Sequence, residues 1–310
     1  MEYIDFGPNK TKVSKVILGC MRIPSKSFED VVSLLDVAKD SGINFLDIAD
    51  CYSNGKAESL LGEALKGKSS YRDSFFIQSK CGINKDDDGI TYFDFSKEHI
   101  IKSVEGSLKR LRTDRLDCLL LHRPDALMDP AEVGEAFNTL RRDGKVLNFG
   151  VSNMNPMQIR LLKSGLDCEL CTNQVQMSIC HTPMLDSGFN ANMTNNASVN
   201  HDGSILEYCR LKKMVIQAWS VLQYGFFQGV FVGSPLYLKL NSVLDRIATE
   251  QGVTSQAVAI AWVLRYSPLM QAVIGTTNPH RVMACAKACD VQLSRKQWYE
   301  LYLASGNDLP

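Results

Sequence analysis

Eight short apolar segments recur along the chain, and each is an uninterrupted run rather than an alternation of apolar and polar residues. Uninterrupted runs of about four to eight residues are typical of strands that are buried on both faces, as in a parallel sheet. The eight predicted strands span residues 16–20, 43–48, 75–80, 116–122, 146–152, 172–175, 214–219 and 272–275.

Segments with helical periodicity separate these runs. The first predicted helix carries its apolar side chains on one face, at Val31, Leu34, Leu35 and Ala38. Several helix starts are marked by a capping residue followed by proline, a pair that favours the first helical turn, at Asp129-Pro130, Asn155-Pro156 and Asn278-Pro279. Gly42 and Gly144 stand where two helices are expected to end before the next strand.

The spacing of the predicted strands leaves room for a helix after each one. Eight consecutive βα units predict a (β/α)₈ TIM barrel of the α/β class, with a doubly wound sheet as the alternative. No G-x-G-x-x-G motif follows the first strand, which weakens the doubly wound dinucleotide-binding alternative. The length suits a single barrel domain over residues 1–310.

Three segments fall outside the repeated pattern. Residues 183–203 are rich in Asn, Ser and Gly, and they are expected to form a long inserted loop. Residues 223–240 are apolar and aromatic and follow the seventh strand. A capping box from Ser294 to Gln297 predicts an extra C-terminal helix.

Composition and charge narrow the function classes. The chain has 34 basic and 34 acidic residues, so no basic surface points to nucleic acid or to an anionic membrane. The N-terminus has no signal-peptide core and no long apolar stretch follows, which favours a cytoplasmic protein. The ten cysteines are then expected to be reduced, and a lone C-x-x-C at Cys168 and Cys171 is weak support for a metal, so no metal is predicted.

Polar side chains stand at the ends of five of the predicted strands, and in a barrel all of these ends meet at one rim, where barrel enzymes carry their active sites. Each residue alone has a structural explanation, as a cap, a solvated cation or a satisfied core histidine. The five positions together indicate a polar site, and they hold Asp47, Lys80, His122, Ser152 with Asn153, and Gln174.

A tyrosine next to the first of these strand ends suggests proton transfer. Tyr52 follows Asp47 by five residues, and a phenol becomes a useful acid when a neighbouring cation stabilises its anion. Lys80 is the candidate cation, with Asp47 to keep it protonated and aimed. His122 can hydrogen-bond a carbonyl oxygen. The set contains no hydride source, so a redox reaction here requires a cofactor.

Seven segments around these residues resemble, in order, the signature segments of the aldo-keto reductases. They are FLDIADCYSNGKAESLLGEAL, SKCG, LDCLLLHRPD, GKVLNFGVSN, TNQVQMS, QAWSVL and VIGTTNPHRV, between Gly19 and about Val282. The chain resembles the bacterial branch of that family more than the animal branch. The resemblance implies the same barrel, with an N-terminal β-hairpin at residues 1–16 closing its bottom.

The resemblance also implies roles for the individual residues. It makes Tyr52 the general acid, with Lys80 lowering its pKa, Asp47 pairing with that lysine and His122 orienting the carbonyl. It implies an NADP(H) cofactor whose carboxamide meets Ser152, Asn153 and Gln174, and whose nicotinamide ring stacks on Trp219. The remaining cofactor contacts that it implies are Ser220, Leu222, Thr276, Thr277, Asn278 and Arg281.

Departures from the family pattern concern the cofactor contacts. Gly275 stands where NADP-preferring members often have lysine, and Ala284 and Cys285 replace a Glu-Asn pair. Val221 replaces the proline of the usual W/Y-S-P-L segment. NADPH stays favoured because Arg281 is retained, and use of NAD is also compatible with these changes.

The sequence therefore predicts an NAD(P)H-dependent reductase that acts on a small aldehyde or ketone, and it leaves the substrate and the oligomeric state open. Two alternatives remain at this point. Lys80 could act as the Schiff-base nucleophile of a lyase or aldolase, because barrels also place such lysines at strand ends. The chain could also be a nucleotide-sensing regulatory protein with slow turnover. Asp50, between the acid and the tyrosine, is expected to be a loop or capping residue outside the chemistry.

Overall fold

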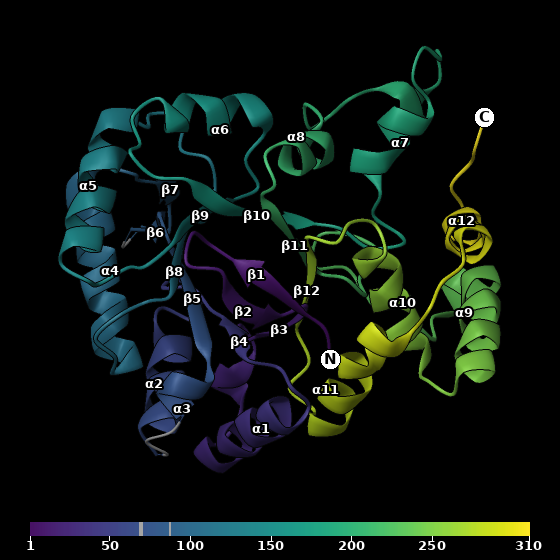
Figure 1. The fold of residues 1–310 in the computed structure, drawn as a ribbon, viewed down its shortest axis with the longest axis horizontal. Helices are drawn as coiled ribbons and strands as arrows, with labels where there is room; N and C mark the ends of the chain where they lie inside the picture. Colours follow the sequence, from purple (N-terminus) through teal and green to yellow (C-terminus); the bar gives the residue numbers. More distant parts are fainter. Residues whose placement is uncertain (68–70, 87) are drawn as a thin grey trace.

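Eight parallel strands form a closed barrel in the computed structural model, which describes residues 1–67, 71–86 and 88–310. The helices surround these strands (Figure 1). Around the barrel each strand pairs with its neighbours in chain order, and the last strand pairs with the first. The predicted α/β barrel is confirmed. Its strands are β3 (Val16–Gly19), β4 (Phe45–Asp47), β5 (Phe76–Cys81), β8 (Cys118–Leu121), β9 (Phe149–Ser152), β10 (Leu170–Gln176), β11 (Val215–Trp219) and β12 (Met270–Ile274).

Helices follow the strands and cover the outside of the barrel. They are α1 (Phe28–Asp40), α2 (Lys56–Gly67), α4 (Lys97–Leu111), α5 (Pro130–Arg142), α6 (Pro156–Lys163), α8 (Ile205–Leu211), α9 (Leu238–Gln251), α10 (Ser255–Leu264) and α11 (Pro279–Ala286). The predicted caps are present: the side chains of Asp129, Asn155 and Asn278 each accept a hydrogen bond from a backbone N–H of the first turn. Gly42 and Gly144 follow α1 and α5 with positive φ angles, as their positions after helix ends require.

An antiparallel hairpin precedes the barrel and lies against the N-terminal ends of its strands. It consists of β1 (Tyr3–Phe6) and β2 (Thr11–Ser14). Its inward side chains, Phe6 foremost, pack with Phe45 and Phe76 from the barrel interior. The turn at Gly7 approaches Asn148, which precedes β9, so closely that a Cβ atom would lie 2.1 Å from the Asn148 oxygen. The hairpin thus covers the end of the barrel opposite the polar rim.

Residues 183–203 are only partly the loop that their composition predicts. A helix, α7 (Pro183–Phe189), occupies the start of the segment, followed by a short 3-10 helix, Asn196–Ser198. The loop prediction is wrong for α7 because proline begins the helix and the apolar side chains of Met184 and Leu185 are buried. Asp186 then accepts a hydrogen bond of 2.7 Å from the phenol of Tyr302.

Three further elements lie outside the repeated pattern. A short helix, α3 (Tyr71–Ser74), precedes β5, and a hairpin of β6 (Ile83–Lys85) and β7 (Thr91–Phe93) follows it; neither is predicted from the sequence. The extra C-terminal helix is confirmed as α12 (Arg295–Ala304), with the Ser294–Gln297 capping box formed. Among the described residues, no helix is long and apolar enough to cross a membrane.

Two glycines make a matched test of packing between the outer helices. A Cβ atom on Gly134 in α5 would lie 1.9 Å from the carbonyl oxygen of Gly165, whereas nothing lies within 4 Å of one on Gly188 in α7. We expect Gly134→Ala to lower the free energy of unfolding by about 1–3 kcal/mol. Gly188→Ala should raise it by roughly 0.5–1 kcal/mol, because alanine favours the helix. Urea unfolding of both variants measures this, and a Gly134→Ala variant as stable as the wild type would contradict it.

Candidate active site

A cavity of about 790 Å³ opens at the C-terminal ends of the barrel strands, from Tyr52 and His122 at one end to Arg281 at the other. Almost every predicted site residue lines it, and Lys80 lies buried just below its floor. The lining residues among those predicted are Asp47, Tyr52, His122, Ser152, Asn153, Gln174, Trp219, Ser220, Leu222, Thr276, Thr277, Asn278 and Arg281.

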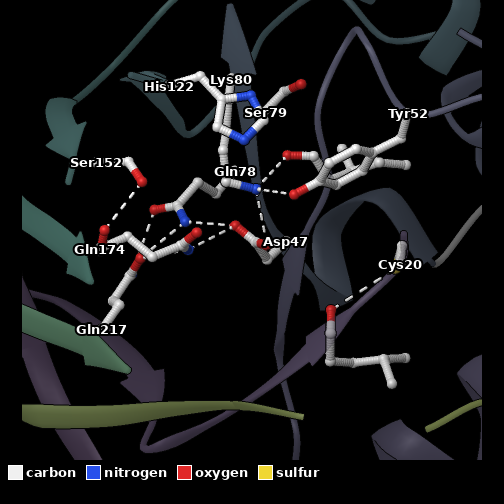
Figure 2. Close-up of polar contacts among 12 residues, drawn as sticks. Cys20, Asp47, Tyr52, Gln78, Ser79, Lys80, His122, Ser152, Gln174 and Gln217 are labelled. Carbon is white, nitrogen blue, oxygen red and sulfur yellow. Dashed lines mark hydrogen bonds and ion pairs between the residues drawn. The ribbon is translucent and has the colours of Figure 1, made fainter. Parts of the chain in front are cut away.

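Lys80 stands at the centre of the polar cluster shown in Figure 2. Its ammonium donates to the Asp47 carboxylate at 2.8 Å, to the carbonyl oxygen of Ile48 at 2.8 Å and to the phenol of Tyr52 at 3.2 Å. An ammonium has three N–H groups, so each of them has a partner. The lysine side chain is fully buried and that of Asp47 is 5% exposed, which means that neither charge could stand here without the other.

The ionisation of Tyr52 reflects two opposing effects. Burial raises the pKa of the phenol above its usual value, while the charge and hydrogen bond of Lys80 act to lower it. Burial has the larger effect, so the pKa of the phenol is raised overall, although Lys80 lowers it in the expected direction. The pKa of Lys80 is itself raised, because the attraction of Asp47 and Tyr52 outweighs the desolvation of the ammonium. At neutral pH the pair is therefore a protonated phenol beside a protonated amine.

His122 faces Tyr52 edge-on, with 5.7 Å between the ring centres. Burial and the nearby positive charges of Lys80 and Arg123 hold the pKa of its imidazole well below the usual range, so the ring is neutral. The Cys51 sulfur lies 3.6 Å from Nδ1 of His122, and burial raises the pKa of that thiol to about 12. Because the sulfur keeps its proton, it can donate to Nδ1, which leaves the Nε2 proton free to point into the cavity.

Four glutamines inside the barrel support Asp47, and only Gln174 among them is a predicted site residue. Gln78 and Gln174 both donate to the carboxylate of Asp47, at 2.7 and 2.9 Å. Gln217 accepts from each of these two glutamines and donates to Gln271 at 3.1 Å. The chain of amides ends at the backbone of the hairpin, where Gln271 donates to the carbonyl oxygen of Ser14 at 2.7 Å. A glutamine in each of four apolar strands is the signal that could have revealed this network.

The amide cluster beside the cavity is held by its own hydrogen bonds. Ser152 donates to the carbonyl oxygen of Gln174 at 2.9 Å, and the Asn153 amide donates to Ser152 at 2.7 Å. The indole of Trp219 donates to the Asn153 oxygen at 3.2 Å. The three predicted carboxamide contacts and the predicted stacking residue are thus brought together. The amide nitrogen of Gln174 is committed to Asp47 and Gln217, so only its oxygen faces a ligand.

The opposite end of the cavity is the N-terminus of α11. Asn278 caps this helix, and its side chain accepts from the backbone of Arg281 at 3.2 Å. The guanidinium of Arg281 is exposed at the rim, and no acidic partner for it exists in the part of the chain that the structure describes. A capped helix start with a free arginine is suited to hold a phosphate group.

The space beside Gly275 is occupied by the side chain of Arg22, which lies near the other end of the sequence. Arg22, in the loop after the first barrel strand, donates to the carbonyl oxygen of Gly275 at 3.0 Å. A Cβ atom on Gly275 would lie 3.1 Å from the same guanidinium nitrogen. The absence of a side chain on Gly275 therefore leaves space for the guanidinium of Arg22. NADP-preferring family members often have a lysine at the position of Gly275, and in this protein Arg22 supplies a positive charge at the same wall of the cavity. Sequence reasoning missed it because the two residues are 253 positions apart.

These features fit a dinucleotide better than a small ligand alone. One end of the cavity offers amides and an indole, which suit a carboxamide-bearing ring, and the other offers two arginines and a helix start, which suit phosphates. Residues that could hold a metal do not compete with this assignment: within the described ranges no group of three or more His, Cys, Asp or Glu side chains could bind one. All ten cysteines are free, including Cys168 and Cys171.

The fold and the site place the chain in a known family. The model of the aldo/keto reductase family matches residues 15–302. The chain is 35% identical to a curated relative, the 6-dehydroglucose reductase of Agrobacterium fabrum, and the alignment covers 97% of each chain. The chain belongs to the aldo/keto reductase family, and its class is that of the oxidoreductases.

Two further relatives are informative. The chain is 35% identical to the oxidoreductase YdhF of Escherichia coli strain K12, with all of both chains covered. Among solved structures, an aldo-keto reductase from Klebsiella pneumoniae in complex with NADPH superposes with a TM-score of 0.76 at 24% identity, covering 97% of this chain and 93% of that one. The structural likeness bears on the fold alone, and it supports the same barrel.

Asp50 is a loop residue, as expected, but it is not exposed. Its side chain is half-buried, and in the described part of the chain one of its oxygens has no hydrogen-bond partner. Burial, followed by the negative charge of the nearby Glu58, raises the pKa of Asp50 to about 7. The folded protein therefore holds a proton on this acid well above the pH at which an unfolded aspartate loses it.

Replacement of Asp50 tests this. In the unfolded chain Asp50 ionises above about pH 4, whereas in the folded chain it keeps its proton to about pH 7. Wild-type stability should therefore fall as pH rises between these values. Asp50→Asn removes that loss. The unfolding free energy of the variant minus that of the wild type should therefore grow by about 1–3 kcal/mol from pH 5 to pH 8. Asp40→Asn, exposed at the end of α1, is the control. An advantage that does not change with pH would disprove the raised pKa.

Proposed function

We propose that the protein reduces an aldehyde or ketone to an alcohol with NAD(P)H, and that Tyr52 is the proton donor. The observation that carries this proposal is the bond of 3.2 Å between the Lys80 ammonium and the Tyr52 phenol at the floor of the cavity. A carbonyl reductase must deliver a proton where charge develops on oxygen, and a phenol supported by a buried cation can do this and remain stable as its anion.

Each of the four site residues has a separate role in the proposed reduction. The cofactor, when bound, supplies the hydride that the carbonyl carbon accepts. Tyr52 gives its phenolic proton to the carbonyl oxygen, and the phenolate that remains is stabilised by Lys80, whose charge Asp47 balances. The neutral His122 donates a hydrogen bond from Nε2 to the same oxygen and so sets the direction from which the carbonyl approaches. The product is the alcohol, and Tyr52 recovers its proton from solvent.

NADPH is the cofactor that we assign to the site, with NADH as a weaker substitute. Ser152, Asn153 and Gln174 would hold the carboxamide, and Trp219 would cover the nicotinamide ring. Ser220 and Leu222 would lie along the pyrophosphate, and Thr276, Thr277, Asn278 and Arg281 would bind the adenosine end. The Klebsiella reductase, which has the same fold, was crystallised with NADPH. The contact of Arg22 with Gly275 adds a second cation at the phosphate end.

The Schiff-base alternative is disfavoured by the state of Lys80. A Schiff base needs a neutral amine with a free lone pair, and the pKa of this lysine is raised, with every N–H already bonded. Borohydride should therefore trap no substrate on Lys80. The sensor alternative makes a different prediction, namely tight NADPH binding with turnover near background on every carbonyl tested.

Removal of the phenol tests the assigned acid. Tyr52→Phe should lower kcat for an active aldehyde by about 100-fold or more, while NADPH binding, measured by quenching of tryptophan fluorescence, stays close to that of the wild type. Tyr92→Phe, exposed on β7 and not among the residues that line the cavity, is the matched control. Wild-type kcat in Tyr52→Phe would show that the proton comes from another group.

Removal of the rim cation tests the cofactor end. Arg281→Leu should raise the Kd for NADPH by roughly 10- to 100-fold, because one charge-assisted contact to a phosphate is lost. NADH, which lacks the additional phosphate, should lose much less. Arg295→Leu, exposed on α12, controls for the change in net charge. Equal weakening of both cofactors would place Arg281 at a phosphate that they share, and no weakening would remove it from the site.

A further inference from the structure

Arg123 lines the same cavity, and neither the proton transfer nor the cofactor contacts use it. It follows His122 directly at the end of β8, so their Cα atoms are about 3.8 Å apart. Its guanidinium lies 5.8 Å from the ring centre of Trp219 and 5.8 Å from that of Phe226. Cation–π contacts with two rings hold the arginine in place without neutralising its charge.

No carboxylate balances Arg123 in the described part of the chain. Six arginines form ion pairs in the described residues, and Arg123 is not one of them: Arg72, Arg110, Arg112, Arg115, Arg142 and Arg246. The acid nearest in sequence, Asp125, is committed to the backbone N–H groups of Phe95 and Leu127, at 2.9 Å each. Arg123 is thus half-buried, and its guanidinium donates no hydrogen bond to any other residue that the structure describes.

The cavity as a whole carries excess positive charge. Asp47 is the one acid among its lining residues in the described chain, and Lys80 already balances it. Arg22 and Arg281 stand at the phosphate end, which leaves Arg123 alone at the end where the carbonyl reacts. Partial burial costs this cation solvation and lowers its pKa from the usual value, so an anion that enters the cavity would recover favourable interaction energy.

We infer that Arg123 binds an anionic oxygen-acid group of the carbonyl substrate, so that the preferred substrate is a short aldehyde or ketone that also carries a carboxylate. This rests on the proposed function and specifies its substrate class. A single planar guanidinium matches a monoanionic carboxylate in a two-point contact. A phosphate ester shares this chemistry, but its second charge would need another cation, and at this end of the cavity the described residues offer only Arg123.

A matched pair of aldehydes isolates the charge. With NADPH at pH 7, 4-carboxybenzaldehyde is compared with methyl 4-formylbenzoate, which has nearly the same size but no charge. The ester group withdraws more electron density than the ionised carboxylate, so the ester is intrinsically the more reactive aldehyde and a preference for the acid cannot come from electronic activation. The 2- and 3-carboxy isomers vary the distance between acid and carbonyl. Glyceraldehyde 3-phosphate against glyceraldehyde forms the phosphate arm. We expect kcat/KM to be at least tenfold higher for the best carboxylate than for its ester, with a smaller ratio in the phosphate arm. A larger ratio there would overturn the assignment to a carboxylate.

Variants then assign the preference to Arg123. Arg123→Met should lower kcat/KM for the carboxylate by about 10- to 100-fold, mainly through KM, and should affect the ester far less. Arg123→Lys keeps the charge and should retain part of the preference. Arg160→Met, an exposed arginine on α6, controls for net charge and should behave as the wild type. Activity on the ester also reports folding and the proposed reduction separately from the acid contact.

Two outcomes would overturn the inference. The wild type could reduce the acid and its ester equally well at every ring position, which would show that the enzyme does not distinguish the charged substrate from the uncharged one. Alternatively, Arg123→Met could weaken both substrates and NADPH binding to the same extent, which would make Arg123 a packing partner of Trp219. Absence of reduction with any aldehyde is a different failure, because it would refute the proposed function itself.

Discussion

The buried ion pair between Asp47 and Lys80 is the interaction on which the rest of the site depends. Charges removed from water to this degree are stable only with a close partner and with their remaining hydrogen-bonding groups satisfied. The ammonium uses all three of its N–H groups, one of them on Tyr52. The position of the phenol and the protonation state of the lysine follow from this ion pair, and the charge of Lys80 adds to burial in keeping His122 neutral.

The glutamine network explains how such a pair can be kept in place. Asp47 accepts from two glutamines in addition to Lys80, and the amides continue through Gln217 and Gln271 to the hairpin. Amides carry no charge to desolvate, yet they supply donors in fixed directions, which makes them suitable second partners for a buried carboxylate. The support of the active site thus extends through the barrel to its closed end.

Periodicity predicted the barrel because the strands are continuous apolar runs and several of the helices begin with a capping residue. The C-terminal end of every predicted strand lies within two residues of the observed one. Sequence reasoning failed where a feature depends on residues distant in the chain. The Cys51–His122 contact, the filling of the Gly275 position by Arg22 and the balance between burial and Lys80 at Tyr52 all require the closed barrel. The loop prediction is wrong for residues 183–189 because the polar composition of the whole segment, 183–203, conceals the two buried side chains near its start.

The bond between Arg22 and Gly275 also constrains the order in which the protein can become competent to bind its cofactor. It joins the loop after the first barrel strand to the loop after the last, across 253 positions. Contacts of such sequence separation form late, since nearly the whole chain must be synthesised and closed into a ring first. A partly synthesised chain that already contains Asp47, Tyr52 and Lys80 would therefore still lack the phosphate end of the cavity. Cofactor binding would then favour only the completed barrel and stabilise it against opening at the β3–β12 seam.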